Sequence, residues 1–287
     1  ESVAIELNWL DAHTNGKPYG VDLIVPTSID GKDGGLTPAE IEARIPPEHK
    51  AYVTRILAEN GIDTKGLWDQ GVPADYGDNL RAAGAMGVLQ EALKHSQVKM
   101  VVNALGVPPP FMMQMARDKG LLVGALTGAK EHAIRHAEAG VDVLIAAGGE
   151  AGGHCGEVAT IVLVPEVIDA VKEFPNLFVL AAGGVVTGRQ MAACMAMGAD
   201  GVWCGSVWLT TAEAETNPAV KEKMLAASSR QTVRSRSRTG KYTRQLRSPW
   251  TDAWQQPEAP EPLPMPLQGL VSEPALIWKV GNPPTLT

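Results

Sequence analysis

Short apolar runs alternate with helical patterns through most of the chain. Six runs of four to seven residues are almost wholly apolar, as is typical of strands buried on both faces of a parallel sheet. They lie at 19–25, 98–104, 121–126, 141–146, 177–182 and 201–204. Amphipathic segments of 8 to 15 residues follow them, notably at 111–119, 129–139, 165–174 and 189–197. This repeated strand–helix order predicts a parallel α/β fold with right-handed crossovers.

Glycines follow three of these runs, at 148–156, 183–184 and 205. In a TIM barrel the carboxyl ends of the strands converge on one mouth, whereas a Rossmann sheet carries a single G-x-G-x-x-G turn near its start. No such turn follows a predicted strand. The pattern therefore favours a (β/α)8 TIM barrel. Six strands leave two βα units unaccounted for, so the first one or two units are expected before Glu1.

Two regions depart from the strand–helix repeat. Residues 27–78 hold two helical patterns between Gly- and Asp-rich turns and predict a helical insertion on the rim, with Thr37 as an N-cap. Beyond residue 248, prolines at 257, 260, 262, 264 and 266 predict an extended tail. The expected domains are thus a TIM-barrel domain at 1–248, which includes this insertion, and an extended proline-rich tail at 249–287. Trp250, Trp254 and Trp278 in that tail suggest a partner surface and a homo-oligomer.

Composition narrows the class of protein. An apolar fraction of 45% and a charged fraction of 20% are typical of a soluble globular chain. A net charge of −7 argues against a nucleic-acid surface, and no apolar run reaches the roughly 18 residues of a membrane span. No signal peptide opens the chain, and three cysteines without metal-like spacing suit a reducing compartment. We expect a soluble cytoplasmic protein.

The candidate chemistry centres on the loop after the run at 141–146, which reads GGEAGGHCGE. Glycines lack side chains and let a ligand approach the backbone; here they are Gly148, Gly149, Gly152 and Gly153. His154 is poorly placed for core packing in such a loop, so it is a candidate base, a hydrogen-bond donor to substrate, or a loop-stabilising residue. Neighbouring residues in an extended loop point to opposite sides, so Cys155 is interpreted as a packing residue.

A second candidate site follows the last two strands. Gly183, Gly184, Gly205 and Ser206 offer bare backbone N–H groups and a hydroxyl where barrels commonly bind phosphate, although tight turns alone would also explain the glycines. His132 and His136 have metal-ligand spacing but no third ligand nearby, so a solvated helix face is favoured and no metal is expected. The basic run at 230–247 is interpreted as a solvated surface or as a contact for an anionic substrate.

These motifs together resemble the nitronate monooxygenase (2-nitropropane dioxygenase) family of FMN-dependent barrels, which includes flavin-dependent enoyl-thioester reductases. The resemblance runs from about residue 17 to 243 and is strongest in EAGGHCG at 150–156 and VLAAGGVVTGRQMAACMAMGADGVWCGS at 179–206. It implies a non-covalently bound FMN and a first strand, with its Met-Gly turn, before Glu1. It also implies that His154 faces the substrate and that the flavin lies along the loop 148–153, with its phosphate on Gly183, Gly184, Gly205 and Ser206.

Two positions depart from the family pattern. Asp22 stands where the family commonly has an asparagine near the flavin, so it is a candidate cofactor contact, and Leu126 stands where nitronate oxidisers often have a lysine. The resemblance implies first an FMN-dependent oxidation of a small alkyl nitronate with O2. The insertion, the basic run and Leu126 favour an alternative, an NAD(P)H-linked reductase or dehydrogenase of an acyl-CoA thioester. A non-catalytic barrel that binds a phosphate ligand is a further alternative.

Overall fold

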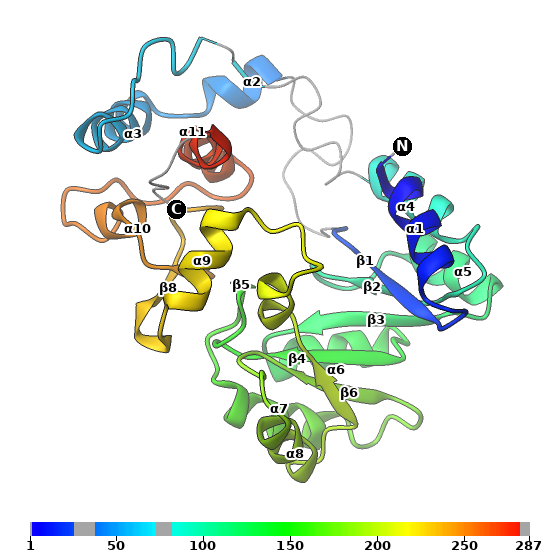
Figure 1. Cartoon of the computed structure of the whole chain (residues 1–287). Coiled ribbons are helices and arrows are strands. Elements are labelled where there is room, and N and C mark those ends of the chain that lie inside the picture. Colours follow the sequence, from blue (N-terminus) through cyan, green and yellow to red (C-terminus); the bar gives the residue numbers. More distant parts are fainter. Residues whose placement is uncertain (1, 26–37, 70, 73–81, 282–287) are drawn as a thin grey trace. The chain divides into compact units, whose positions relative to one another are not determined.

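The chain forms two compact units in a computed structural model, which describes residues 2–25, 38–69, 71–72 and 82–281 (Figure 1). The first, here called the sheet unit, comprises 1–32, 77–150 and 156–204. The second, here called the helical unit, comprises 33–76, 151–155 and 205–287. Each unit has a hydrophobic core of its own, built only from its own residues.

Six parallel strands make the sheet unit, in the order β1-β2-β3-β4-β6-β7. They are β1 (Tyr19–Leu23), β2 (Val98–Asn103), β3 (Leu122–Thr127), β4 (Val143–Ala147), β6 (Phe178–Ala182) and β7 (Gly201–Trp203). All six strands predicted from the apolar runs are confirmed. β4 is buried along its whole length, which explains why its sequence has no alternation of polar and apolar residues.

Helices cover one face of this sheet. They are α4 (Ala82–Ala92), α5 (Pro110–Asp118), α6 (Lys130–Glu138), α7 (Thr160–Val171) and α8 (Gly188–Ala196). α7 begins five residues before its predicted start, with Pro165 inside it. Leu163 and Val164 are fully buried in the core, and their burial outweighs the hydrogen bond that a proline inside a helix removes.

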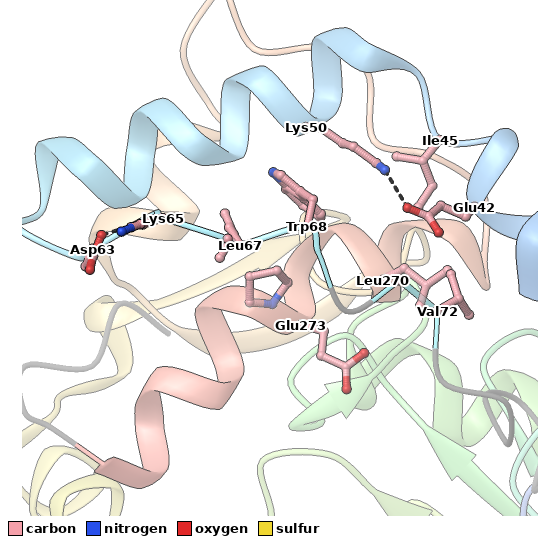
Figure 2. Close-up of a pocket in the computed structure, with 13 residues that line it drawn as sticks. Glu42, Ile45, Lys50, Asp63, Lys65, Leu67, Trp68, Val72, Leu270 and Glu273 are labelled. Atoms are coloured by element: carbon pink, nitrogen blue, oxygen red, sulfur yellow. Dashed lines mark hydrogen bonds and ion pairs between the residues drawn. The ribbon is translucent and has the colours of Figure 1, made fainter.

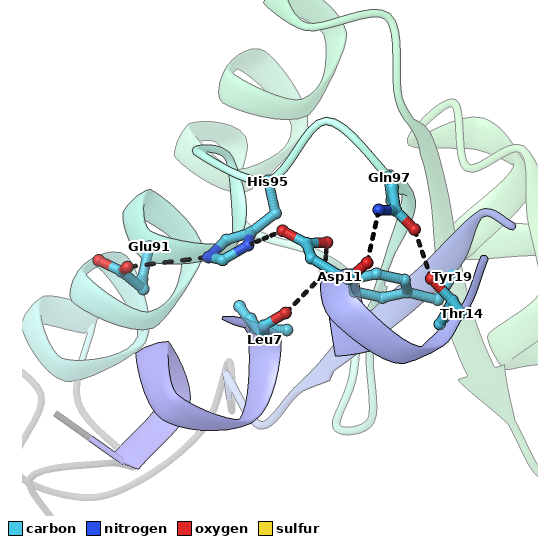
Figure 3. A network of polar contacts seen from close by, with 7 residues as sticks. All are labelled: Leu7, Asp11, Thr14, Tyr19, Glu91, His95 and Gln97. Carbon is cyan, nitrogen blue, oxygen red and sulfur yellow. Dashed lines mark hydrogen bonds and ion pairs between the residues drawn. The ribbon is translucent and has the colours of Figure 1, made fainter. Parts of the chain in front are cut away.

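A polar network attaches α1 (Ser2–His13) to the sheet unit (Figure 3). The Asp11 carboxylate contacts His95 Nδ1 at 2.7 Å and accepts a hydrogen bond from the Tyr19 hydroxyl at 2.8 Å. These partners, His95 first, lower the pKa of Asp11. The Gln97 side chain donates to the Asp11 carbonyl and accepts from the Thr14 hydroxyl, so α1, β1 and the end of α4 are joined by side chains.

The helical unit combines segments distant in sequence. It contains α2 (Pro38–Ala43), α3 (Pro47–Glu59), η2 (Ser206–Thr210), α9 (Pro218–Ala226), η3 (Ser229–Gln231), α10 (Pro249–Ala253) and α11 (Leu267–Gly281). A small antiparallel sheet has the order β5-β9-β8, with β5 (Gly153–His154), β9 (Thr243–Leu246) and β8 (Thr232–Ser235). The loop residue His154 therefore belongs to a strand pair.

The expectation of an extended tail is wrong for much of 249–281, because α10 and α11 are helices. Trp250 is fully buried and Trp254 nearly so, in one core with Ile56 and Leu57 of the predicted insertion. Pro249 lies at the start of α10 and the prolines at 257–266 lie in the connection before α11, whereas Pro274 lies inside α11. Trp250 and Trp254 therefore form core rather than a partner surface. Thr37 and the side chain of Trp278 lie outside the described residues.

Candidate functional site

The loop after β4 is fixed by the first turn of α7. Glu150 accepts hydrogen bonds from the backbone N–H and the hydroxyl of Thr160, at 2.8 and 2.9 Å, and so caps the helix. The Thr160 hydroxyl also lies 3.0 Å from the Gly183 carbonyl, at the end of the neighbouring strand β6. Glu150 therefore acts as a cap of α7.

Packing accounts for two of the predicted flavin-side glycines. A Cβ on Gly148 would lie 2.3 Å from Thr160 Oγ1 and 2.5 Å from the Thr160 Cα, so the start of α7 already fills that space. A Cβ on Gly149 would lie 3.3 Å from the Glu157 carbonyl. Close protein contacts suffice to require glycine at 148, whereas the fit at 149 is tight without excluding a side chain; contact of either glycine with a cofactor stays a prediction.

The turn after β6 needs glycine for its backbone. Gly183 and Gly184 have φ values of 105° and 72°, which side chains rarely adopt. A Cβ on Gly184 would also meet Glu150 Cβ at 3.1 Å, and the Gln190 side chain donates to the Gly184 carbonyl at 2.8 Å. The space beside Gly184 that we expected for a phosphate is therefore partly taken by Glu150.

Gly205 differs from the other glycines. Its φ is −113°, and apart from its chain neighbours no atom of the described residues lies within 4 Å of the place where its Cβ would be. Neither strain nor packing explains this glycine, so its backbone is open to a ligand. Ser206, which follows Gly205, packs its hydroxyl against Gly152: its Oγ lies 2.3 Å from the place where a Cβ on Gly152 would be. Binding of an FMN phosphate by Gly205 and Ser206 stays a prediction.

His154 lies on β5, where it pairs with Thr243 of β9, and its side chain is exposed. Its Nε2 lies 2.9 Å from the hydroxyl of Thr239. The protein atoms around the ring lower the pKa of His154, and the positive charges of Lys241 and Arg238 lower it further. The lowered pKa of His154 favours the neutral imidazole, which can accept a proton. Thr239 was missed from sequence, since 85 positions separate it from His154.

Basic side chains surround His154 on the hairpin of β8 and β9. Arg244 pairs with Gly153 across the small sheet, and Arg238 and Lys241 are exposed on the connection between the two strands. The Arg234 guanidinium stacks 3.8 Å from the ring centre of Tyr242. Arg236 has a structural role instead, because it bonds the Gly240 carbonyl at 2.9 Å and pairs with Glu261. Residues 234–244 are called the basic hairpin below.

Two polar residues lie at the carboxyl ends of β1 and β2. Asp22 is exposed, but the protein atoms around its carboxyl group raise its pKa to about 6. Asn103 is fully buried and was missed from sequence; its side chain accepts from the Val25 N–H at 2.9 Å and donates to the Val25 carbonyl at 3.1 Å. The sequence feature that could have identified Asn103 is its place as a polar residue at the end of an apolar strand. Contact of Asp22 with a cofactor stays a prediction.

The prediction of a solvated face is wrong for His136, whose ring is buried beneath α6, whereas His132 is exposed. Burial lowers the pKa of His136 to about 4, and a bond to the Leu126 carbonyl opposes that shift. Among the residues that the structure describes, no group of three or more His, Cys, Asp or Glu side chains could hold a metal ion.

A separate cavity of about 290 Å³ lies within the helical unit (Figure 2). Trp68 forms one wall, fixed by a hydrogen bond from Nε1 to Thr54 at 3.1 Å, and Lys50 pairs with Glu42 at 2.9 Å beside it. No pattern in the sequence predicts this cavity, and none of the predicted site residues lines it. The other lining residues are Ile45, Asp63, Lys65, Gly66, Leu67, Gly71, Val72, Leu270, Glu273 and Pro274.

A six-stranded parallel sheet whose strands are joined through helices and followed by glycine loops is the arrangement expected of a barrel-type fold. The model of the nitronate monooxygenase family matches residues 66–275, and the chain belongs to this family. The predicted TIM-barrel-type α/β fold is thereby confirmed, and the chain is an oxidoreductase of a family that uses FMN. Within the described residues, no helix has the length and apolar character required to cross a membrane.

Relatives of this chain carry two kinds of name. The Mycobacterium tuberculosis protein Rv1533, which carries the name of a monooxygenase, is 50% identical over 274 residues, covering 94% of this chain and 72% of its own length. A (3aS,4S,5R,7aS)-5-hydroxy-7a-methyl-1-oxo-octahydro-1H-indene-4-carboxyl-CoA dehydrogenase of Rhodococcus jostii is 36% identical over 192 residues, 66% of this chain and 52% of that protein. A probable nitronate monooxygenase of Staphylococcus haemolyticus is 31% identical over 192 residues, 63% of this chain and 52% of that protein. The chain thus spans about half the length of the last two.

Two solved structures resemble the fold. Nitroalkane oxidase from Streptomyces ansochromogenes gives a TM-score of 0.69 at 23% identity and covers 99% of this chain and 78% of that chain. FabK from Thermotoga maritima gives a TM-score of 0.55 at 26% identity and covers 82% of this chain and 74% of that chain. The first likeness concerns the fold alone.

Proposed function

We propose that this chain is an FMN-dependent oxidoreductase of an acyl-CoA thioester, with His154 as the group that exchanges a proton with the substrate. The observation that carries the proposal is the basic hairpin around His154. A small nitronate has one negative charge, whereas a CoA thioester carries several phosphate charges, and the exposed Arg238 and Lys241 suit the latter. The 36% identity to a carboxyl-CoA dehydrogenase supports the same choice.

We assign separate roles in cofactor binding and proton transfer to residues of this chain. Gly205 and Ser206 would hold the FMN phosphate through an open backbone and a hydroxyl. FMN, when bound, supplies an acceptor or donor for an electron pair. His154, whose lowered pKa favours the neutral form, would take the proton that leaves substrate carbon or oxygen on dehydrogenation. In the reverse direction it would return that proton. NAD(P)H is the expected electron source for reduction.

A second candidate is the oxidation of an alkyl nitronate with O2, favoured by the family match over 66–275. Here His154 would be the hydrogen-bond partner of the nitronate, or the base that forms it from the neutral nitroalkane. Reconstituted protein separates the candidates under anaerobic conditions. If acyl-CoA esters or NAD(P)H followed by enoyl-CoA change the flavin absorbance and nitronates do not, the thioester proposal holds. Bleaching by nitronates alone would establish the second candidate, and failure to take up FMN would favour a non-catalytic binder.

Charge variants test the substrate contact directly. Neutralising Arg238 and Lys241 together, each to Gln, should raise the KM for a CoA ester about tenfold, equivalent to about 1.4 kcal/mol, and weaken its salt dependence. The KM for a small nitronate should change less than twofold. Arg247→Gln is the matched control, since Arg247 is exposed and pairs with Asp252 at 2.7 Å. Equal effects of all these variants on the CoA ester would refute the role of the basic hairpin.

A further inference from the structure

The hydroxyl of Thr239 has three polar neighbours. Its Oγ1 lies 2.9 Å from His154 Nε2, 3.3 Å from the Lys241 carbonyl oxygen and 3.4 Å from the Lys241 backbone nitrogen. A threonine hydroxyl has one proton to donate and two lone pairs that accept. The Lys241 N–H uses one lone pair, so a proton and one lone pair are left for the other two contacts.

Only one arrangement pairs a donor with an acceptor at each contact. The Thr239 hydroxyl donates a hydrogen bond to the Lys241 carbonyl, and its remaining lone pair accepts a hydrogen bond from the N–H at His154 Nε2. In the reverse arrangement the hydroxyl would donate to Nε2, and its lone pairs would face the Lys241 carbonyl oxygen at 3.3 Å. Two acceptors that face each other form no hydrogen bond. The first arrangement gives a hydrogen bond to the hydroxyl, to both Lys241 backbone groups and to His154 Nε2.

The loop that carries Thr239 is held firmly. The buried Gln268 side chain of α11 donates to the Ser237 carbonyl at 2.7 Å, and the buried Ser272 hydroxyl donates to the Arg238 carbonyl at 2.7 Å. On the other side, the Gly240 N–H donates to the Arg236 carbonyl at 2.9 Å. Because anchors lie on both sides of Thr239, its hydroxyl is presented to His154 in a fixed position.

We propose that Thr239 is a positioning residue which keeps the proton of His154 on Nε2 and leaves Nδ1 as the atom that exchanges a proton with the substrate. The positive charges of Arg238 and Lys241 on the same connection oppose a second proton on the ring, so the neutral tautomer is the resting form. The importance of this tautomer for turnover rests on the proposed function. The tautomer itself does not, because it is a property of the protein without substrate.

Histidine nitrogen NMR reads the tautomer. Protein labelled with ¹⁵N-histidine, with the His154 signals assigned by their loss in His154→Gln, should show protonated Nε2 and unprotonated Nδ1 at pH 8. Thr239→Ser keeps the hydroxyl and should keep this pattern. Thr239→Val keeps the shape and removes the hydroxyl, so it should give a mixture of tautomers. A proton on Nδ1 in the wild type, or an unchanged pattern in Thr239→Val, would overturn the assignment.

Turnover gives the second readout. Thr239→Val should lower kcat by about 10- to 100-fold and shift the acid limb of the pH profile of kcat, with KM and the FMN Kd within twofold of the wild type. Thr239→Ser should restore both kcat and the pH profile. Equal loss in both variants would show a merely structural role. The expected tautomer shift without any measurable thioester or nitronate turnover would refute the proposed function and leave the positioning role of Thr239 intact.

Discussion

The glycines at 148 and 205 should respond in opposite ways to the same change, a single methyl group. In Gly148→Ala the new Cβ would lie 2.3–2.5 Å from Thr160 atoms, two of them backbone atoms at the start of α7. The helix cannot move aside without breaking the bonds from Thr160 to Glu150 and Gly183. Overpacking of this kind costs about 1–3 kcal/mol. For a chain of this size, about 2 kcal/mol lowers Tm by about 4–8 °C.

In Gly205→Ala the methyl group meets no atom within 4 Å in the part of the chain that the structure describes, its chain neighbours aside, and the φ of −113° suits alanine. The Tm of the FMN-free protein should therefore stay within about 1 °C, since surface changes of this kind stay within about 0.5 kcal/mol. The Kd for FMN should rise at least tenfold, because the methyl group occupies the approach to the backbone. Differential scanning fluorimetry and FMN titration by fluorescence measure the two effects. A stable Gly148→Ala, or unchanged FMN binding in Gly205→Ala, would refute the distinction.

Three further outcomes follow from burial and pKa. Trp250→Ala should destabilise the protein by about 3–5 kcal/mol in chemical denaturation, since Trp250 is fully buried, and a loss below about 1 kcal/mol would contradict its place in the core. The pKa of His136 is about 4 in the folded protein, below its value in the unfolded chain, so the free energy of unfolding falls as the pH falls from about 6.5 to 4. His136→Leu should flatten the fall of Tm in that range. An unchanged slope would contradict burial of the neutral ring. The pKa of Asp22 is raised to about 6 in the folded protein, so its ionisation lowers the free energy of unfolding as the pH rises from about 4 to 6. Asp22→Asn should therefore raise Tm more at pH 8 than at pH 4. Equal gains at the two pH values would be inconsistent with that pKa.

The apolar runs of the sequence located the strands well, because burial on both faces leaves little room for polar residues. β4 is buried at every position and was predicted within a residue or two. The helical tail was harder to predict. Prolines dominate its composition, whereas its fold depends on Trp250 and Val271 packing against residues of α3 that lie about 200 positions earlier. Such long-range partners are not visible in local periodicity.

The candidate site shows the same limit. All the glycines of the loops look alike in sequence, yet Gly148 is required by Thr160, Gly184 by its positive φ, and Gly205 by neither. Only the neighbours in space separate a packing glycine from one that faces open space. Thr239 and Asn103 were missed for a related reason, because each acts on a residue 78 or more positions away.

The central claim is that His154 transfers a proton in a flavin-dependent reaction, and His154→Gln tests it most directly. The variant should bind FMN with a Kd within twofold of the wild type, because His154 lies on β5 and not on the proposed phosphate loop at 205–206. Anaerobic stopped-flow measurement of flavin reduction or oxidation by a CoA ester should show a rate about 10²- to 10⁴-fold lower. A rate within threefold of the wild type, with FMN fully bound, would contradict the account.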